Sequence, residues 1–262
     1  MTQTLAATTT EMMTIASARL LKDGQVCFVG IGLPSAAANL ARLTQAPEVV
    51  LIYESGPIGA KPTVLPLSIG DGELALTADT VVSTPEIFRY WLQGNRIDIG
   101  FLGAAQIDRF ANLNTTVIGP YARPKIRLPG AGGAPEIASS AKEVFIILRQ
   151  SKRTFVNKVD FITSIGFGDG GDHRARLKLP GKGPTKVVTD LCIMEPAAGT
   201  NELTVTHLHE GVTREQVAEN TGWPIQFADT VYTVAPATED ELRALRDLQQ
   251  RTMIAHGMDS GE

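Results

Sequence analysis

Residues 49–60 read VVLIYESGPIGA, and the rest of the chain is interpreted around them. The aliphatic and β-branched run at 49–53 predicts a buried strand, which the following Ser-Gly-Pro cannot continue. Glu54 therefore stands at the carboxyl end of a strand, where ligands bind in open α/β sheets. Its carboxylate is a candidate nucleophile, base or metal ligand. It is equally a candidate for a plain acceptor of a loop amide, because many strand ends carry solvated acids.

Length and composition exclude several classes of protein. The chain has 262 residues, 43% of them hydrophobic and 20% charged, which is a globular balance and fits one α/β domain over residues 1–262. Residues 1–10 resemble a frayed terminus and lack the features of a signal peptide. The net charge of −4, with scattered cations, predicts no nucleic-acid partner, and no apolar run is long enough for a membrane. Cys27 and Cys192 are expected to be reduced core residues of a cytoplasmic protein.

Hydrophobic periodicity predicts an open, mostly parallel sheet flanked by helices. Helices are predicted at 11–21, 36–43, 84–93, 135–141, 213–221 and 239–255, strands at 26–29, 49–53, 97–103, 143–148, 159–165, 187–194 and 202–209, and a hairpin-like segment at 112–116. Two segments show no period. Residues 56–80 are rich in glycine and proline and are expected to cover a substrate or to contact a partner subunit, and residues 166–183 are expected to form a mobile loop.

Two glycine-rich segments are candidate anion sites. Residues 30–35, GIGLPS, join a strand to a helix, a junction that can point backbone amides at an anion, although a tight turn with close helix packing is the favoured interpretation. The third glycine of a dinucleotide fingerprint is replaced by Ser35, so a nicotinamide site is not expected. Residues 128–135, LPGAGGAP, can direct neighbouring amides at one oxygen as an oxyanion hole, or can be a plain loop.

Two histidines on one predicted strand raise the question of a metal site. His207 and His209 share a face because strand side chains repeat every two residues. A zinc site would need a third ligand, and none lies nearby in the sequence. Half-exposed histidines without a metal are the favoured interpretation.

Four short segments occur together in a specific order: VGIGLP at 29–34, ESG at 54–56, GAAQID at 103–108 and GAGGA at 130–134. With these, the chain resembles the β subunits of class I CoA-transferases over nearly its whole length. The E-S-G form resembles the glutaconate CoA-transferase branch. Within that branch, residues 53–63 and 168–174 are most similar to the 3-oxoadipate CoA-transferases of aromatic-compound degradation.

The resemblance implies a covalent mechanism. Glu54 would attack the thioester of the donor and then carry CoA as a glutamyl thioester, and an ionised carboxylate needs no partner base for this. The resemblance also implies that no cofactor takes part, because CoA thioesters are substrates. It further implies two sets of contacts: an oxyanion or CoA loop at Gly130, Gly132, Gly133 and Ala134, and CoA or substrate contacts at Gly30, Gly32, Ser55, Gly56 and Gln106.

The resemblance implies a separate α subunit in an α2β2 assembly, with succinyl-CoA as donor and 3-oxoadipate as acceptor. The second carboxylate of that acceptor would be read by the segment around Asp172, His173 and Arg174, or by an α-subunit residue. A glutaconate-type transferase for another acid, a CoA-thioester hydrolase on the same fold and a non-catalytic subunit stay open as alternatives. Transfer without net hydrolysis, and its loss on Glu54→Gln, would separate them.

Overall fold

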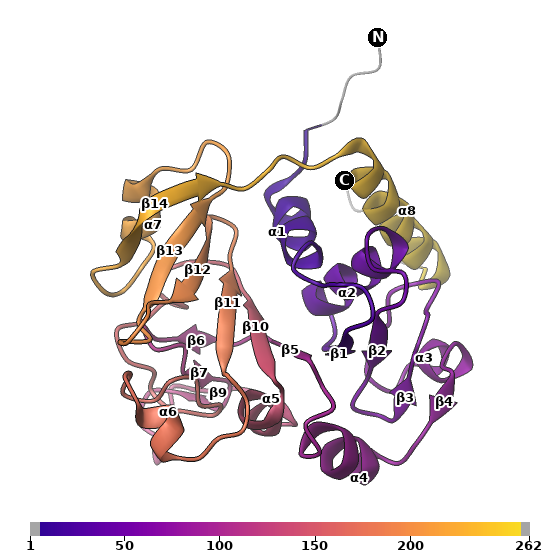
Figure 1. Ribbon diagram of the computed structural model, residues 1–262, viewed down its shortest axis with the longest axis horizontal. Coiled ribbons are helices and arrows are strands. Elements are labelled where there is room, and N and C mark those ends of the chain that lie inside the picture. Colours follow the sequence, from indigo (N-terminus) through magenta and orange to yellow (C-terminus); the bar gives the residue numbers. More distant parts are fainter. Residues whose placement is uncertain (1–5, 258–262) are drawn as a thin grey trace. The chain divides into compact units, whose positions relative to one another are not determined.

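The computed structural model describes residues 6–257, which divide into two compact units (Figure 1). Unit 1 contains the described residues up to Tyr90 together with those from Pro236 onward, and unit 2 runs from Trp91 to Ala235. The prediction of one domain over the whole chain stays a prediction. Each unit is described separately below.

Unit 1 is built on three helices, α1 (Thr9–Ala18), α2 (Leu33–Leu43) and α8 (Glu239–Ala255), with α2 packed against the other two. Thr8 caps α1 through a capping box with Glu11. The predicted frayed terminus is therefore wrong for residues 8–10, whereas residues 1–5 lie outside the described residues. The predicted end of this helix at residue 21 is also too late. The predicted span of α8 is confirmed, and Thr238 and Glu241 form its capping box.

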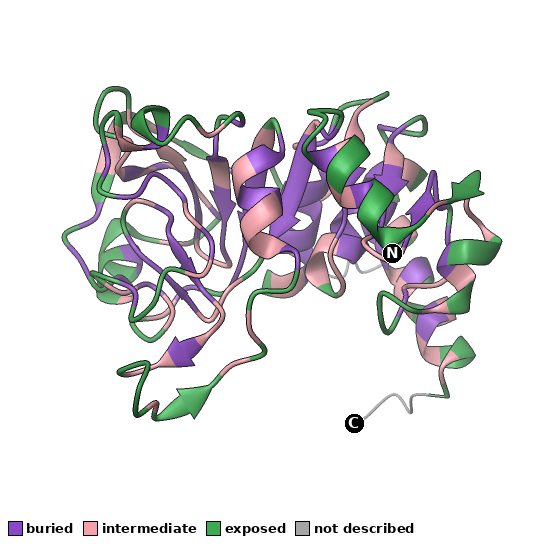
Figure 2. Ribbon diagram, turned by 90° about the horizontal axis from the view of Figure 1, so that it is seen from below, coloured by how far each residue is buried: buried purple, intermediate pink, exposed green. Residues whose placement is uncertain are grey.

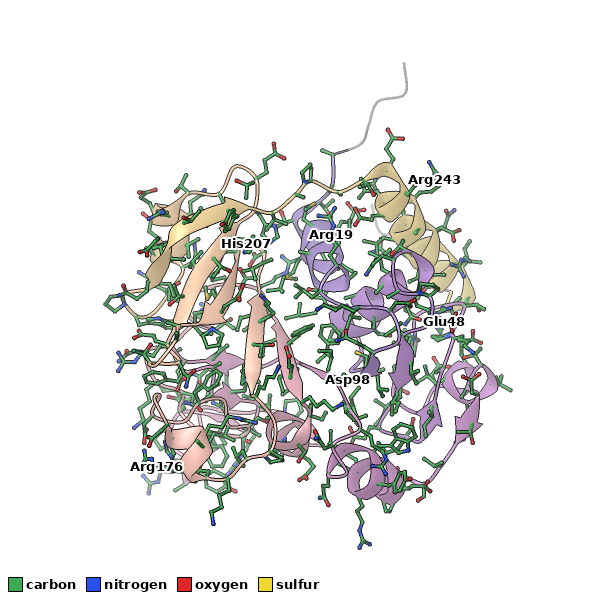
Figure 3. The ribbon with its side chains drawn as sticks, in the orientation of Figure 1. Arg19, Glu48, Asp98, Arg176, His207 and Arg243 are labelled. Atoms are coloured by element: carbon green, nitrogen blue, oxygen red, sulfur yellow. The ribbon has the colours of Figure 1, made fainter. Side chains whose placement is uncertain are left out.

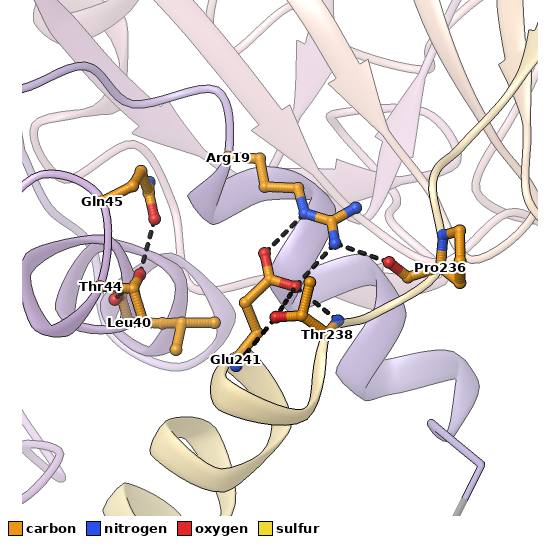
Figure 4. A network of polar contacts seen from close by, with 7 residues as sticks. All are labelled: Arg19, Leu40, Thr44, Gln45, Pro236, Thr238 and Glu241. Carbon is orange, nitrogen blue, oxygen red and sulfur yellow. Dashed lines mark hydrogen bonds and ion pairs between the residues drawn. The ribbon is translucent and has the colours of Figure 1, made fainter.

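Two ion pairs tie α8 to the region of α1, and Figure 4 shows the pair of Arg19 and Glu241. The Arg19 guanidinium donates to both carboxylate oxygens of Glu241 at 2.7 Å and to the carbonyl of Pro236 at 2.8 Å. Arg246 pairs with Glu11 at 2.6 Å. The hydrogen bond from Arg246 holds the pKa of Glu11 below its usual value. Both ends of the described chain are thereby held in one unit.

The strands of unit 1 are β1 (Val26–Phe28), β2 (Val50–Ile52), β3 (Pro57–Ile58) and β4 (Thr80–Val81), in that spatial order. β1 and β2 are parallel, and the remaining pairs are antiparallel. The segment predicted to be irregular, 56–80, contains β3 and the short helix α3 (Gly72–Leu76). The predicted helix 84–93 is α4 (Thr84–Glu86) followed by a π-helical segment at Ile87–Leu92, which reaches the boundary between the units.

The main sheet of unit 2 contains six strands in the spatial order β14-β13-β12-β11-β10-β5. They are β5 (Ile99–Leu102), β10 (Glu143–Ile147), β11 (Pro184–Val188), β12 (Cys192–Pro196), β13 (Leu203–Leu208) and β14 (Gln226–Thr233). β10 pairs in parallel with β5 and β11, β12 is antiparallel to both of its neighbours, and β13 and β14 are parallel. Strands β5 and β10 are almost wholly buried (Figure 2).

Two strand predictions in unit 2 are wrong. The predicted strand 187–194 is the end of β11 and the start of β12, because the Thr189 hydroxyl accepts hydrogen bonds from the amides of Leu191 and Cys192 and closes a tight turn. The predicted strand 159–165 is absent apart from a single bridge between Ser164 and Leu113. The edge strand β14 was not predicted.

The other elements of unit 2 are the helices α5 (Ala134–Ser140), α6 (His173–Arg176) and α7 (Arg214–Glu219), and two short hairpins. The hairpins pair β6 (Gln106–Ile107) with β7 (Leu113–Asn114), and β8 (Val117–Ile118) with β9 (Ile126–Arg127). Helix α5 packs closely on β5 because Gly100 has no side chain. A Cβ there would lie 2.4 Å from the Ile137 side chain. The predicted α/β class is confirmed. None of the helices in residues 6–257 has the length and apolar character that a membrane span needs.

Candidate active site

The candidate site of unit 1 lies at the carboxyl ends of β1 and β2. The parallel register pairs Phe28 with Ile52, and the Val29 amide donates to the Ile52 carbonyl at 2.9 Å. The turn that follows each strand is therefore at the same edge of the sheet. This edge carries Gly30 and Gly32 on one turn and Glu54 and Ser55 on the other, so the structure brings these predicted residues together.

A four-residue turn presents Glu54. The Gly56 amide donates to the Tyr53 carbonyl at 3.0 Å, which places Glu54 and Ser55 at the two central positions. Gly56 has a φ of +122°, and a Cβ on it would lie 2.0 Å from the Val82 carbonyl oxygen. Only glycine fits there. Of the Ser-Gly pair that follows the glutamate, the glycine is thus required by the backbone conformation.

The carboxylate of Glu54 has no internal partner. Glu54 is half-buried. Within residues 6–257 its side chain accepts no hydrogen bond and makes no ion pair. The interpretation of Glu54 as an acceptor for a loop amide therefore has no support from residues 6–257. The carboxylate is in position to react with a ligand.

A buried polar network lies next to this turn, and it was not predicted from the sequence. The Tyr53 hydroxyl is 3.2 Å from the Ser35 hydroxyl and accepts from the Asn39 amide at 3.3 Å. Arg42 continues the network by donating to the Asn39 side-chain oxygen and, at 2.9 Å, to the Pro62 carbonyl. Burial raises the pKa of the Tyr53 phenol, which keeps it protonated. Polar residues at positions 35 and 39, one helical turn apart in an alanine-rich helix, were the available signal.

The Gly30 turn has the features of a helix start. Gly32 is the N-cap of α2 with a φ of +80°, and Pro34 occupies the first turn. Nothing lies within 4 Å of a Cβ built on Gly32. Glycine is therefore favoured there by the positive φ and not by crowding from neighbouring atoms. This agrees with the favoured interpretation of a tight turn. A CoA contact by Gly30 or Gly32 stays a prediction.

The glycine loop belongs to unit 2 and is fixed at its base. The Gly130 amide donates to the Thr115 carbonyl at 2.8 Å, and the Thr115 hydroxyl donates to the Gly130 carbonyl at 2.7 Å. The Ala134 amide is already used by the Ala131 carbonyl. Of the four residues predicted for this loop, only Gly132 and Gly133 have amides that donate no hydrogen bond within residues 6–257. These two amides are the better candidates.

Gln106 is held inside unit 2. Its side-chain oxygen accepts from Asn114 at 2.7 Å and from the Asp160 amide at 3.0 Å, and its nitrogen donates to the Asp160 carboxylate at 3.2 Å. The residue is 6% exposed. These contacts give Gln106 a structural role, and its predicted contact with CoA or substrate stays a prediction.

Asp108, the last residue of the GAAQID segment, is also structural. It is buried and accepts hydrogen bonds from the amides of Phe110 and Asn112 and from the Asn112 side chain. Asn112 in turn binds the backbone of Gly166 and Gly168. Burial raises the pKa of the Asp108 carboxyl despite these donors.

The segment 166–183 is anchored by buried residues at 166–168 and 174, whereas residues 175–178 are exposed, and its predicted mobility stays a prediction. Arg174 is buried and donates to the carbonyls of Gly181, Gly166, Ala138 and Ser139 at 2.8 to 3.2 Å. Burial lowers the pKa of this guanidinium to about 10. Because its donors are used by two carbonyls of α5 and by the carbonyls of Gly166 and Gly181, Arg174 is not placed to bind a substrate carboxylate. Neighbouring Arg176 points outward (Figure 3).

The two histidines do not share one environment. His207 lies on β13 and contacts the Thr206 hydroxyl at 3.0 Å and the ring of Tyr232. His209 is buried after the strand, and its Nε2 lies 2.9 Å from the Thr189 carbonyl. No cluster of three or more possible metal ligands was found within residues 6–257.

Comparison with known proteins places the chain in a family. The family model for coenzyme A transferases matches residues 10–220, which lie in both units. The chain is 74% identical to the B subunit of the 3-oxoadipate CoA-transferase of Pseudomonas knackmussii, over 98% of this chain and 99% of that one. It is 38% identical to the B subunit of the glutaconate CoA-transferase of Acidaminococcus fermentans, over 87% and 88%. The crystal structure of glutaconate coenzyme A-transferase from that organism matches with a TM-score of 0.85 and 34% identity, over 92% and 94% of the two chains. The chain therefore belongs to the coenzyme A transferase family.

Proposed function

We propose that the chain is the β subunit of a CoA-transferase that moves CoA from succinyl-CoA to 3-oxoadipate through a glutamyl-CoA thioester on Glu54. The observation that carries the proposal is the Glu54 carboxylate, which has no partner among residues 6–257 and stands on a turn that requires glycine, at the carboxyl edge of two parallel strands. The substrate is supported by the name of the relative that is 74% identical over nearly the whole chain.

The reaction proceeds by four acyl exchanges. A Glu54 oxygen attacks the succinyl carbonyl, the carbon–sulfur bond breaks, and CoA thiolate leaves a mixed anhydride. The thiolate attacks the glutamyl carbonyl, which releases succinate and leaves Glu54 as the CoA thioester. A carboxylate of 3-oxoadipate displaces the thiolate to form a second anhydride. The thiolate then attacks the oxoadipyl carbonyl, which gives 3-oxoadipyl-CoA and restores Glu54. Every bond is made and broken by the substrates and one carboxylate, so no cofactor is required.

Each exchange develops negative charge on a carbonyl oxygen. The amides of Gly132 and Gly133 are the candidates to stabilise it, because each carries an N–H without a protein acceptor in the described residues. A single donor of this kind contributes about 10²- to 10³-fold to kcat. Their role stays a prediction from the sequence resemblance.

The proposal includes a second, different subunit. The most similar relatives cited above are named as the B subunits of their enzymes, which supports an α subunit as partner. We place the two chains in an α2β2 assembly. Co-expression followed by size-exclusion chromatography with light scattering would give the stoichiometry, and a β chain that is fully active alone would contradict this part.

A covalent trap tests the central claim. The co-expressed complex is incubated with succinyl-CoA, reduced with borohydride and digested, and the peptide that contains Tyr53, Glu54 and Ser55 is read by mass spectrometry. A Glu54 reduced to the alcohol is expected, because borohydride reduces a thioester and leaves a carboxylate. An unmodified Glu54 in a complex that binds CoA would contradict the covalent route.

The acceptor is tested separately. With the trap positive, the complex is assayed with 3-oxoadipate, acetoacetate and glutaconate, and formation of each CoA thioester is followed together with free CoA. The highest kcat/KM is expected for 3-oxoadipate, without net release of free CoA. Release of CoA in proportion to succinate would identify a thioester hydrolase, and a higher kcat/KM for another acid would correct the substrate.

A further inference from the structure

A basic hairpin immediately precedes the glycine loop. Residues 109–135 contain four cations, Arg109, Arg123, Lys125 and Arg127, and no acid, in a chain whose net charge is −4. Three of these cations belong to the hairpin that pairs β8 with β9, and all three residues are exposed. We name Arg123, Lys125 and Arg127 the hairpin cations. Such a local excess of positive charge fits a polyanionic ligand.

Two aromatic rings accompany the hairpin cations. The rings of Tyr121 and Phe161 stack with their centroids 5.4 Å apart, and Tyr121 and Phe161 are 58% and 36% exposed. The Arg127 guanidinium lies 4.8 Å from the centre of the Tyr121 ring and donates to the Tyr121 carbonyl at 3.1 Å. Because Phe161 and the Arg127 guanidinium both lie against the Tyr121 ring, Phe161 is the ring on which a base can stack, and the neighbouring cations can pair with phosphates.

Hydrogen bonds hold the base of the hairpin and the start of the glycine loop together. The Leu128 amide donates to the Thr116 carbonyl, and Thr115 and Gly130 exchange two hydrogen bonds. Thr163 joins this base through hydrogen bonds with the Thr115 amide and the Thr116 hydroxyl. Gly132 is five positions after Arg127 in the sequence, a span of at most about 18 Å. An extended pantetheine arm covers a distance of that order.

We infer that this hairpin binds the adenosine 3′-phosphate 5′-diphosphate end of CoA, with the adenine against Phe161, which Tyr121 supports from its other side, and the phosphates on the hairpin cations. The inference rests on the proposed function, because it requires a CoA thioester whose carbonyl is held at the glycine loop. One acid contacts the hairpin: the Asp160 carboxylate accepts the Gly119 amide at 2.8 Å and the Gln106 side chain at 3.2 Å. These two donors offset its repulsion of phosphate.

The test compares two donors and two double variants of the co-expressed complex. Arg123→Glu/Lys125→Glu reverses two hairpin cations whose side chains make no hydrogen bond or ion pair within residues 6–257. Lys152→Glu/Arg153→Glu makes the same charge change at two other exposed residues of unit 2 and is the matched control. Succinyl-CoA carries the nucleotide, and succinyl-pantetheine lacks it.

The hairpin variant is expected to lose at least about tenfold in kcat/KM for succinyl-CoA, mostly through KM, and to keep its kcat/KM for succinyl-pantetheine. The control should keep both. Equal losses on both donors would overturn the inference, since they would indicate a damaged fold or an α-subunit contact. A loss no larger than that of the control would also overturn it.

Binding of adenosine 3′,5′-bisphosphate, measured by calorimetry on the same complexes, separates this inference from the proposed function. If the wild-type complex shows no CoA transfer, and the bisphosphate binds the hairpin variant more weakly than the control variant, the proposed function is refuted and the nucleotide site is supported. If the wild-type complex transfers CoA, and the bisphosphate binds both variants equally well, the nucleotide site is refuted and the proposed function is supported.

Discussion

Glu54 and Asp108 both follow a buried strand, and the structure uses them in opposite ways. Glu54, two residues after β2, is half-buried and has no internal partner in the described residues. Asp108, directly after β6, is 5% exposed, and its oxygens accept hydrogen bonds from two amides and a side chain. A carboxylate at a strand end is free for chemistry only where the surrounding backbone leaves its lone pairs unused. Four substitutions test this contrast.

The largest effect is expected at Glu54. Glu54→Gln should reduce the kcat of CoA transfer by about 10⁴-fold or more, because the nucleophile is lost. Its unfolding midpoint should stay that of the wild type, because the fold loses no contact. Glu48→Gln, an exposed acid ahead of β2, is the control and should change neither quantity (Figure 3). A Glu54→Gln complex that keeps a tenth of the activity would remove Glu54 from the mechanism.

Arg174 supports the structural network that contains Asp108. It donates to the Gly166 carbonyl, and the Gly166 amide donates to Asn112, which binds Asp108. Arg174→Met should lower the free energy of unfolding by about 3 kcal/mol or more, because the carbonyls of three buried residues, Gly166, Gly181 and Ala138, lose their side-chain donor. Urea denaturation measures it. Exposed Arg176→Met is the matched control, expected within about 0.5 kcal/mol. Similar losses of unfolding free energy for both variants would show that the buried hydrogen bonds of Arg174 do not stabilise the fold more than an exposed arginine does.

Asp108→Asn should cost about 1–3 kcal/mol of stability and leave the activity of the folded complex unchanged. Burial raises the native pKa of Asp108, so its stabilising contribution is complete below the unfolded pKa of about 3.9 and is lost as pH rises through the native value. The stability difference between wild type and variant should therefore shrink with rising pH over that window. Exposed Asp229→Asn is the control. A loss of kcat in the folded Asp108→Asn complex would contradict the structural role.

The smallest change in stability is expected at Glu11, and its pH dependence is opposite to that of Asp108. The Arg246 hydrogen bond lowers its native pKa, so the stabilisation is present above the unfolded value of about 4.3 and is lost as pH falls through the native one. The stability difference between wild type and Glu11→Gln should be largest near neutral pH and should vanish on acidification. Urea midpoints from pH 3 to 7 measure it. A difference independent of pH would mean that the ion pair does not stabilise the docking of α8.

The sequence predicted the features that depend on local pattern. The amphipathic helix 239–255, the parallel strands around residues 26 and 50, and the two glycine turns all follow from periodicity or from backbone requirements. The sequence did not show which polar residues are used up by the fold. Arg174 was read as a substrate-binding candidate because its four carbonyl acceptors come from residues that only the tertiary structure brings together.

The strand errors have a similar cause. Residues 187–194 form one apolar run, and the turn inside it depends on a single hydroxyl, that of Thr189. Tyr53 was read only as part of a buried strand, because its partners Ser35 and Asn39 lie 18 and 14 residues away. Long-range hydrogen bonding of this kind leaves no periodic trace in a single sequence.

The crowding at Gly56 has an evolutionary consequence. Val82, directly after β4, restricts the shape of the turn, because its carbonyl would collide with a side chain at position 56. The side chain at position 54 makes no hydrogen bond or ion pair within residues 6–257 that would hold that shape. Saturation mutagenesis should therefore find position 56 intolerant and position 54 permissive for folding. A new reaction could then arise on this scaffold by a single codon change, with no stability to recover first.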